Sequence, residues 1–97
     1  MAKRAKIIRA IREAVRKMEY EFAIPHFFDE MENDGLLFSD IESAIFNGRI
    51  NEVYTDDPRG PRYEIVGTAA DGRTIGVICR IKETHWLLFI TTWEIYE

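Results

Sequence analysis

Residues 57–80 read DPRGPRYEIVGTAADGRTIGVICR, and this stretch decides the fold. Apolar residues alternate with others on both sides of Asp71-Gly72, a dipeptide typical of a tight β-hairpin turn. The pattern therefore predicts two antiparallel strands joined at Asp71-Gly72. The same stretch gathers four arginines, although the chain is acidic, with a formal net charge of −4. These are Arg59, Arg62, Arg73 and Arg80.

A two-residue turn would fix the pairing of the two strands. Tyr63 then lies opposite Arg80, and Gly67 opposite Gly76, all on one face of the sheet. We expect that face to show a shallow gap at the two glycines, flanked by Tyr63, Arg80 and Thr91. The other face is the more apolar, and we assign it to the helices. It carries Arg62, Glu64, Val66, Ile75, Val77, Cys79 and Ile81, joined by Leu88 and Ile90.

Four strands are predicted, near residues 50–55, 61–68, 73–81 and 86–93, and helices precede them. Strands joined in sequence by short turns form an antiparallel meander. The sequence thus predicts an α+β fold in which N-terminal helices pack on a four-stranded antiparallel sheet. The 97 residues are expected to form a single domain.

The first helix is expected over residues 1–18, because Ile8, Ile11 and Val15 follow helical spacing between basic residues. Its charges either contact RNA or a partner, or remain solvated while the apolar stripe packs. A second helix should run from His26 to the Gly35 stop, and a third from a Ser39/Glu42 capping box to Gly48. The segment 20–25, YEFAIP, is ambiguous because its alternation is stopped by the proline.

Charge and cysteine content exclude several classes of protein. The net charge is +6 over residues 1–18, −10 over 19–57 and zero over 58–97, which argues against broad nucleic-acid binding but leaves room for a local RNA site. Cys79 is the single cysteine, so a reducing cytoplasm is the expected compartment. No apolar run is long enough for a membrane span, and no metal or cofactor pattern is present.

The candidate chemistry is phosphate binding. We expect Arg59, Arg62, Arg73 and Arg80 to contact phosphate and Tyr63 to stack on a base. The alternative is structural: Arg80 stacks on Tyr63 across the strands, while Arg59 and Arg62 pair with Asp57 and Glu64. His26 is a candidate general acid or base, or else a buried structural histidine, and His85 should be solvated in a turn.

An ordered series of motifs extends over about residues 20–97. The series is His26, Met31, Gly35, Gly48, Asp57-Pro58-Arg59-Gly60, Arg62-Tyr63, Gly67, Asp71-Gly72-Arg73, Cys79-Arg80 and Ile90-Thr91. It resembles a widespread bacterial family that is catalogued as a domain of unknown function and is similar to the BrnT and RelE-like toxins. The basic helix of residues 1–18 lies outside this toxin-like core.

The resemblance implies helices packed on an antiparallel sheet. It also implies kinship with toxins that cleave messenger RNA and are often encoded beside an antitoxin, in some relatives an antitoxin of the MqsA zinc-finger type. A ribonuclease would use His26, Arg62 and Arg80 as catalytic residues, and Arg59, Tyr63, Arg73 and Thr91 to bind RNA. The chain departs from that pattern where it has Glu30 and Asp34 in place of arginines, and in its acidic balance. A non-catalytic module that kept the toxin fold, and that binds a partner protein or regulates expression, is the competing hypothesis.

Overall fold

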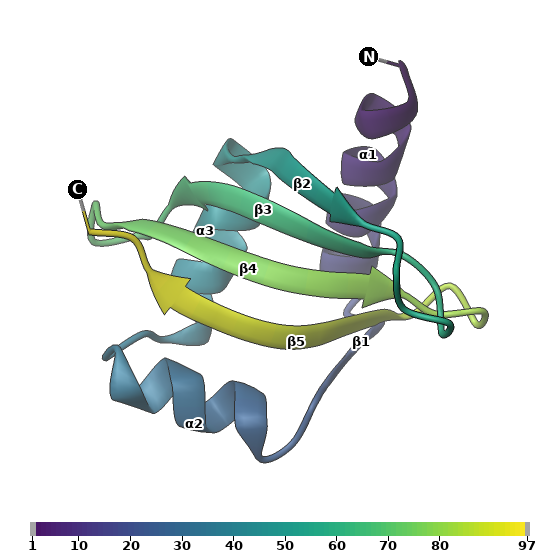
Figure 1. The fold of residues 1–97 in the computed structure, drawn as a ribbon. Helices are drawn as coiled ribbons and strands as arrows, with labels where there is room; N and C mark the ends of the chain where they lie inside the picture. Colours follow the sequence, from purple (N-terminus) through teal and green to yellow (C-terminus); the bar gives the residue numbers. More distant parts are fainter. Residues whose placement is uncertain (1, 97) are drawn as a thin grey trace.

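The computed structural model describes residues 2–96, which form three helices and one five-stranded sheet (Figure 1). The elements are α1 (Ala2–Arg16), β1 (Tyr20–Phe22), α2 (His26–Asn33), α3 (Phe38–Asn47), β2 (Arg49–Tyr54), β3 (Arg62–Thr68), β4 (Thr74–Ile81) and β5 (Leu87–Glu94). The strand order is β1-β5-β4-β3-β2. The α+β class is therefore confirmed, but the sheet has one strand more than predicted and is mixed, because β1 runs parallel to β5.

Strand β1 is the element that sequence reasoning left open. Tyr20 pairs with Leu87 and Phe22 with Phe89, so the segment extends the edge of the sheet beside β5. The Phe22 ring also stacks on Phe89, with ring centroids 5.6 Å apart, and lies 4.9 Å from the Phe28 ring. Aromatic packing against α2 and β5 thus supports a strand that is too short to show a clear alternation.

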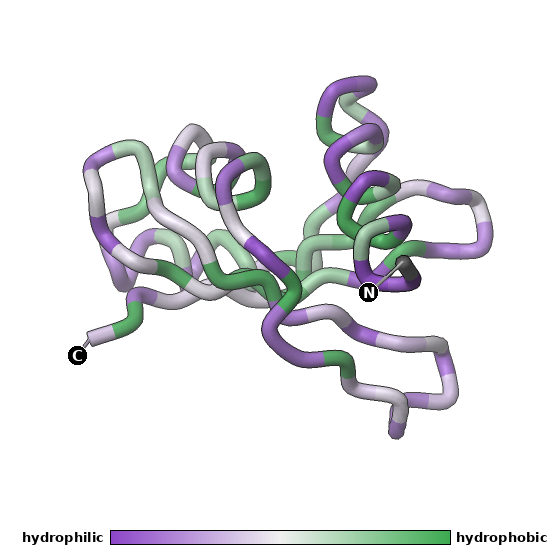
Figure 2. Tube along the Cα trace, turned by 90° about the horizontal axis from the view of Figure 1, so that it is seen from above, coloured by the Kyte–Doolittle hydropathy of each residue, from purple (hydrophilic) through white to green (hydrophobic). Residues whose placement is uncertain are grey.

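Helix α1 packs through the predicted stripe. Ile11 is fully buried and Val15 nearly so, while Ile8 packs partly against the same core. Hydrophobic and hydrophilic residues alternate along this helix (Figure 2). Arg12 donates 2.9 Å hydrogen bonds to the carbonyl oxygens of Ile45 and Gly48, which stabilises the C-terminal end of α3. Part of the basic character of α1 is therefore structural. Residue 1 of the predicted helix lies outside the described residues.

Helix α3 begins at Phe38, two residues earlier than the predicted Ser39/Glu42 capping box allows. The carboxylate of Asp40 takes the capping role, because its Oδ2 accepts a 2.8 Å hydrogen bond from the Leu37 amide. Its Oδ1 accepts a 3.1 Å bond from the Ala70 amide, which ties the start of α3 to the β3–β4 turn. The buried stripe of α3 is confirmed: Ile41, Ala44 and Ile45 are fully buried.

The β3–β4 turn is one residue longer than predicted, and this changes the register. The Ala69 amide donates a 2.7 Å hydrogen bond to the Arg73 carbonyl, so the loop holds three residues and closes through Gly72 at φ +97°. Tyr63 consequently pairs with Cys79 rather than with Arg80. Because side chains alternate along a strand, the one-residue shift turns Tyr63 and Arg80 to opposite faces.

The two faces of the sheet are therefore composed differently from the prediction. The helix-covered face buries Ile65 with Ile75, Val77 and Cys79, and Tyr63 packs against that core. The opposite face, called the open face below, has no covering helix among residues 2–96. Its strand residues include Tyr54, Arg62, Glu64, Val66, Gly76, Ile78, Arg80, Leu88, Thr91 and Trp93.

The predicted glycine gap does not exist. A Cβ on Gly67 would collide with the backbone of Ala44 in α3, so Gly67 lies against a helix instead of on an exposed surface. A Cβ on Gly76 would collide with the Trp93 ring, which covers that position on the open face. Thr91 pairs with Ile78 and not with Gly76 for two reasons: the β4–β5 loop holds three residues, closed by the Lys82 amide on the Trp86 carbonyl, and β5 has one extra residue opposite Ile78 and Cys79.

Candidate phosphate-binding site

Three of the predicted arginines meet at one end of the sheet, around the carboxylate of Asp57. Arg80 donates a 2.6 Å hydrogen bond from Nη2 to Asp57 Oδ2. Arg59 donates to the same carboxylate from Nε and Nη2, at 3.1 and 3.0 Å, and from its backbone amide at 2.9 Å. Arg62 lies beside them, with its Nε 4.0 Å from Asp57 Oδ2. We call Arg59, Arg62 and Arg80 the arginine cluster.

The elements that carry the cluster explain why it forms. Arg80 is near the end of β4 and Arg62 begins β3, and both point to the open face. The loop of residues 55–61, between β2 and β3, carries Asp57 and Arg59 to this same end of the sheet (Figure 1). The predicted pairing of Arg59 with Asp57 is confirmed. Arg62 pairs with Asp56 at 3.2 Å, whereas the predicted partner Glu64 accepts a bond from Asn51.

The electrostatics of the cluster favour anions. Hydrogen bonds from the Arg59 side chain and backbone lower the pKa of the Asp57 carboxyl to about 2, so this group is ionised at neutral pH. Three guanidinium groups therefore surround one largely buried carboxylate. Arg80 Nε and Arg62 Nε are buried and have no hydrogen-bond partner among residues 2–96. Buried guanidinium donors without partners are unusual, because leaving such a donor unsatisfied is costly.

A cleft of about 460 Å³ adjoins the cluster. It lies between the loop of residues 55–61 and the β4–β5 hairpin, and it is lined by Arg59, Arg80, Lys82, Glu83, Thr84 and Leu88. Lys82 had not been predicted as a site residue, and its Nζ lies 3.0 Å from both carboxylate oxygens of Glu21. The sequence signal for Lys82 was its spacing of two from Arg80, which places both near one strand end.

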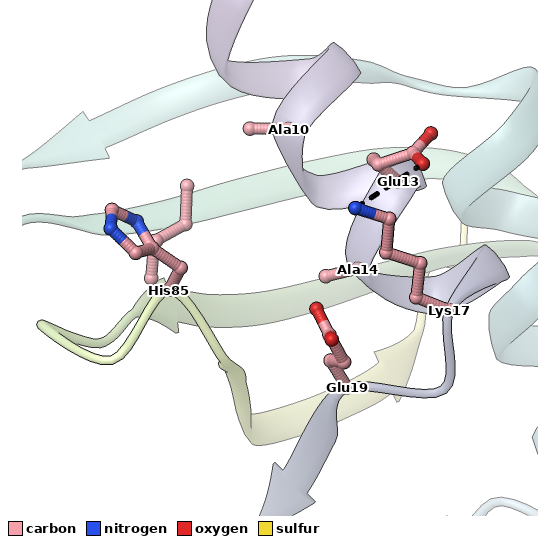
Figure 3. A pocket seen from close by; sticks show the side chains of 7 residues that line it. Ala10, Glu13, Ala14, Lys17, Glu19 and His85 are labelled. Atoms are coloured by element: carbon pink, nitrogen blue, oxygen red, sulfur yellow. Dashed lines mark ion pairs between the residues drawn. The ribbon is translucent and has the colours of Figure 1, made fainter.

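A second, smaller hollow of about 180 Å³ lies between α1 and the β4–β5 hairpin (Figure 3). Its lining includes Ala10, Ala14 and the exposed His85, and Lys17 lies 3.8 Å from Glu13 at its edge. The prediction that His85 is solvated in a turn is confirmed. The ionisable residues of this hollow are Glu13, Lys17, Glu19 and His85, with no arginine among them, so for an anion the larger cleft is the better candidate site.

The remaining predicted site residues do not join the cluster. His26 is the first residue of α2, on the side of the sheet that the helices cover. Its side chain is exposed, so the alternative prediction that His26 is a buried structural histidine is wrong. Tyr63 packs against the core, and Thr91 lies beside Ile78 on the open face. The structure thus brings Arg62 and Arg80 together but separates both from His26.

Arg73 lies at the opposite end of β4 and makes structural contacts. It donates to the carbonyl oxygens of Asp34 and Gly35, at 2.7 and 2.9 Å, just after the end of α2. It also donates to the carboxylates of Asp71 and Glu94, at 2.9 and 3.0 Å. The hydrogen bonds that Arg73 donates to these carboxylates, first to Asp71 and then to Glu94, raise the pKa of Arg73. Every guanidinium nitrogen of Arg73 is thus engaged by protein.

Neither a metal centre nor a reactive thiol competes with this assignment. Within residues 2–96, no group of three His, Cys, Asp or Glu side chains is placed to hold a metal ion. Burial raises the pKa of the Cys79 thiol to about 12, which keeps it protonated and unreactive. Over the same residues, no helix has the length and apolar character required to cross a membrane.

A comparison with protein-family models matches residues 25–94 to the family described as Domain of unknown function (DUF4258). The chain belongs to this family. The DUF4258 match includes α2, α3 and strands β2–β5, and therefore the whole arginine cluster, whereas α1 and β1 precede it. Comparisons with curated proteins and with solved structures found no match.

Proposed function

We propose that this protein binds RNA, and that the arginine cluster and the adjoining cleft hold its phosphate groups. The observation that carries the proposal is the convergence of Arg59, Arg62 and Arg80 on one carboxylate, beside a cleft that Lys82 also lines. Guanidinium groups match phosphate oxygens in charge and geometry. Two of these guanidinium groups retain a buried Nε–H donor without a partner within the described residues.

RNA is favoured over a small anion by the aromatic side chains of the open face. Tyr54 lies with its ring centroid 5.4 Å from the Arg62 guanidinium, and the Trp93 ring covers Gly76. Single-stranded RNA is held by stacking of bases on such rings together with cationic contacts to the backbone. The acidic balance of the chain restricts the contact to this one region, which suits a short single-stranded segment.

Binding is better supported than cleavage. Cleavage of RNA through its 2′-hydroxyl needs a general base and an acid within reach of the phosphate. His26 lies on the helix-covered side of the sheet, and His85 lines the other hollow. Among the residues that line the cleft, Glu83 is the one carboxylate. The kinship with RelE-like and BrnT-like toxins, and an antitoxin partner, remain predictions from the sequence resemblance.

The proposal is tested by measuring the affinity for a fluorescent single-stranded RNA over a series of salt concentrations. We expect Arg80→Ala to weaken binding about tenfold, and to lower the salt slope by roughly 0.7 for one lost phosphate contact. Arg73→Ala is the matched control, because it removes the same charge from the other end of the same strand and should leave the affinity unchanged.

Two results would contradict the proposal. One is an absence of RNA binding by the wild-type protein at low salt. The other is an equal loss of affinity in the Arg80→Ala and Arg73→Ala variants, which would indicate a general charge effect. Electrophoresis of the same RNA after incubation reports whether binding is accompanied by cleavage.

A further inference from the structure

The carboxylate of Asp57 lies where the guanidinium groups of the cluster converge. Its side chain is 9% exposed and that of Arg80 is 7% exposed, so this ion pair is largely removed from water. The loop that carries Asp57 thus supplies an anion to its own arginines. A protein carboxylate and a phosphate group are recognised by guanidinium in the same way, through oxygen atoms that accept parallel N–H bonds.

We infer that Asp57 is an internal ligand of the proposed RNA site, and that a phosphate group of RNA displaces it from Arg80 and Arg62. The inference rests on the proposed function and adds its regulation. In the ligand-free protein the loop of residues 55–61 closes the site. In the bound protein the phosphate takes the place of the carboxylate, and the loop swings away from the sheet.

The unpartnered donors are the reason that the loop must move. Arg80 Nε and Arg62 Nε are shielded from water as well as lacking a partner among residues 2–96. A ligand oxygen reaches them after the covering part of the protein has shifted. The carboxylate of Asp57 has two oxygens, both of which already accept bonds from Arg59. A phosphate group has more acceptor oxygens on a tetrahedral frame, so it can engage donors that the carboxylate leaves free.

The construction of the loop is consistent with such a movement. Its carboxylates are held to the sheet by ion pairs, Asp57 to Arg80 at 2.6 Å and Asp56 to Arg62 at 3.2 Å. Gly60 has φ +120°, a conformation that other residues rarely adopt, and it separates Pro58 from Pro61. The exchange also conserves charge, because a singly charged phosphodiester replaces a singly charged carboxylate, which is released to water.

The first test compares the RNA affinities of Asp57→Asn and Asp56→Asn. Both variants remove one negative charge from adjacent positions of the same loop, so they are matched for any general electrostatic effect. If Asp57 competes with phosphate, Asp57→Asn should bind single-stranded RNA about tenfold more tightly than wild type, because the open site becomes more populated. Asp56→Asn should tighten binding less than Asp57→Asn does, because the Asp56 side chain is 81% exposed and contacts Arg62 alone, at 3.2 Å. Thermal midpoints establish that both variants are folded.

The second test measures, by pulsed electron paramagnetic resonance, the distance between spin labels on Pro58→Cys in the loop and His85→Cys in the β4–β5 hairpin. Both positions are exposed, and the native Cys79 is buried. Addition of RNA should lengthen this distance, because the loop leaves the sheet. An unchanged distance in the RNA-bound protein would overturn the inference even if Asp57→Asn has changed the fold.

The outcomes separate the two proposals. If wild type binds RNA but Asp57→Asn gains no more affinity than Asp56→Asn, or loses affinity, the displacement is wrong and the RNA site stands. If neither wild type nor Asp57→Asn binds RNA at low salt, both proposals are wrong. If Asp57→Asn binds and wild type does not, the site is real and Asp57 closes it.

Discussion

Arg73 and Arg80 flank the same strand, and they differ in how their guanidinium groups are used. Arg73 precedes β4 and donates to two carbonyl oxygens and two carboxylates, which join α2, β5 and the β3–β4 turn. Arg80 is near the end of β4, and among residues 2–96 it donates one hydrogen bond, to Asp57. Yet Arg80 is the more buried of the two, with a side chain 7% exposed against 27%.

The difference shows that burial alone does not identify a structural arginine. A guanidinium group has five N–H donors, and its free capacity for a ligand depends on how many of them the protein engages. The donors of Arg73 are directed at the end of a helix, where carbonyl groups lack partners. The one hydrogen bond that Arg80 donates within the described residues goes to a loop carboxylate, that of Asp57. The contacts of the Arg73 end therefore serve stability, and the Arg80 end is the one with unused donors, where the binding site is proposed.

Arg73→Ala should have the largest effect on the free energy of unfolding, and it tests the structural side of this comparison. Loss of charge-assisted bonds to Glu94 and Asp71, and of the bonds to the end of α2, should lower the free energy of unfolding by about 2–3 kcal/mol. Urea denaturation measures the change. Arg49→Ala, at an exposed position in β2, is the control and should change stability by less than about 0.5 kcal/mol. Equal effects of the two variants would remove the structural assignment of Arg73.

Arg80→Ala should lower the free energy of unfolding by less, although the Arg80 side chain is the more deeply buried of the two. Asp57 keeps its three bonds from Arg59 in this variant, so the buried carboxylate is not left alone. We expect a loss of about 1 kcal/mol in urea denaturation, because removing Arg80 also removes a buried Nε donor that has no partner within the described residues. A loss larger than that of Arg73→Ala would reverse the comparison, because Arg80 would then be the structural residue of the pair.

The smallest effect concerns acid. The folded-state pKa of Asp57 is about 2, below its ordinary value of 3.8, so its ion pairs stabilise the fold fully above that ordinary value. This stabilisation is lost as pH falls from about 4 towards 2. Asp57→Asn should therefore show a shallower decline of unfolding free energy over this interval than wild type. Parallel declines in the two proteins would show that the pairing of Asp57 contributes no stability.

Much of the fold could be predicted because the signals were local. The apolar stripe of α1, the Gly35 stop after α2 and the strand ranges after residue 48 depend on spacing within one element. The register of β3 and β4 was not local. Asp71-Gly72 fits a two-residue loop and a three-residue loop equally well. The three-residue loop is accompanied by two contacts with α3: the Asp40 carboxylate accepts a hydrogen bond from the Ala70 amide, and the Ala44 backbone lies against Gly67.

The candidate site was predicted by composition rather than by geometry. The gathering of arginines in residues 57–80 identified Arg59, Arg62 and Arg80, which do meet. The argument from Tyr63 failed because it depended on the register, and Arg73 could not be excluded because its partners, Asp34 and Gly35, are distant in sequence. The central role of Asp57 was likewise hidden, since its pairing with Arg80 joins a loop to a distant strand end.

The parallel pairing of β1 with β5 also bears on how the chain is made. Residues 20–22 leave the ribosome long before β5, the strand to which they must pair, because β5 is the last strand in the sequence. Contacts between such distant segments form late and slow folding. Until residues 87–89 have been synthesised, the ring of Phe22 lacks Phe89. The cleft is equally late, because residues 82–84 and 88 of the β4–β5 hairpin line it and must be synthesised before it can form.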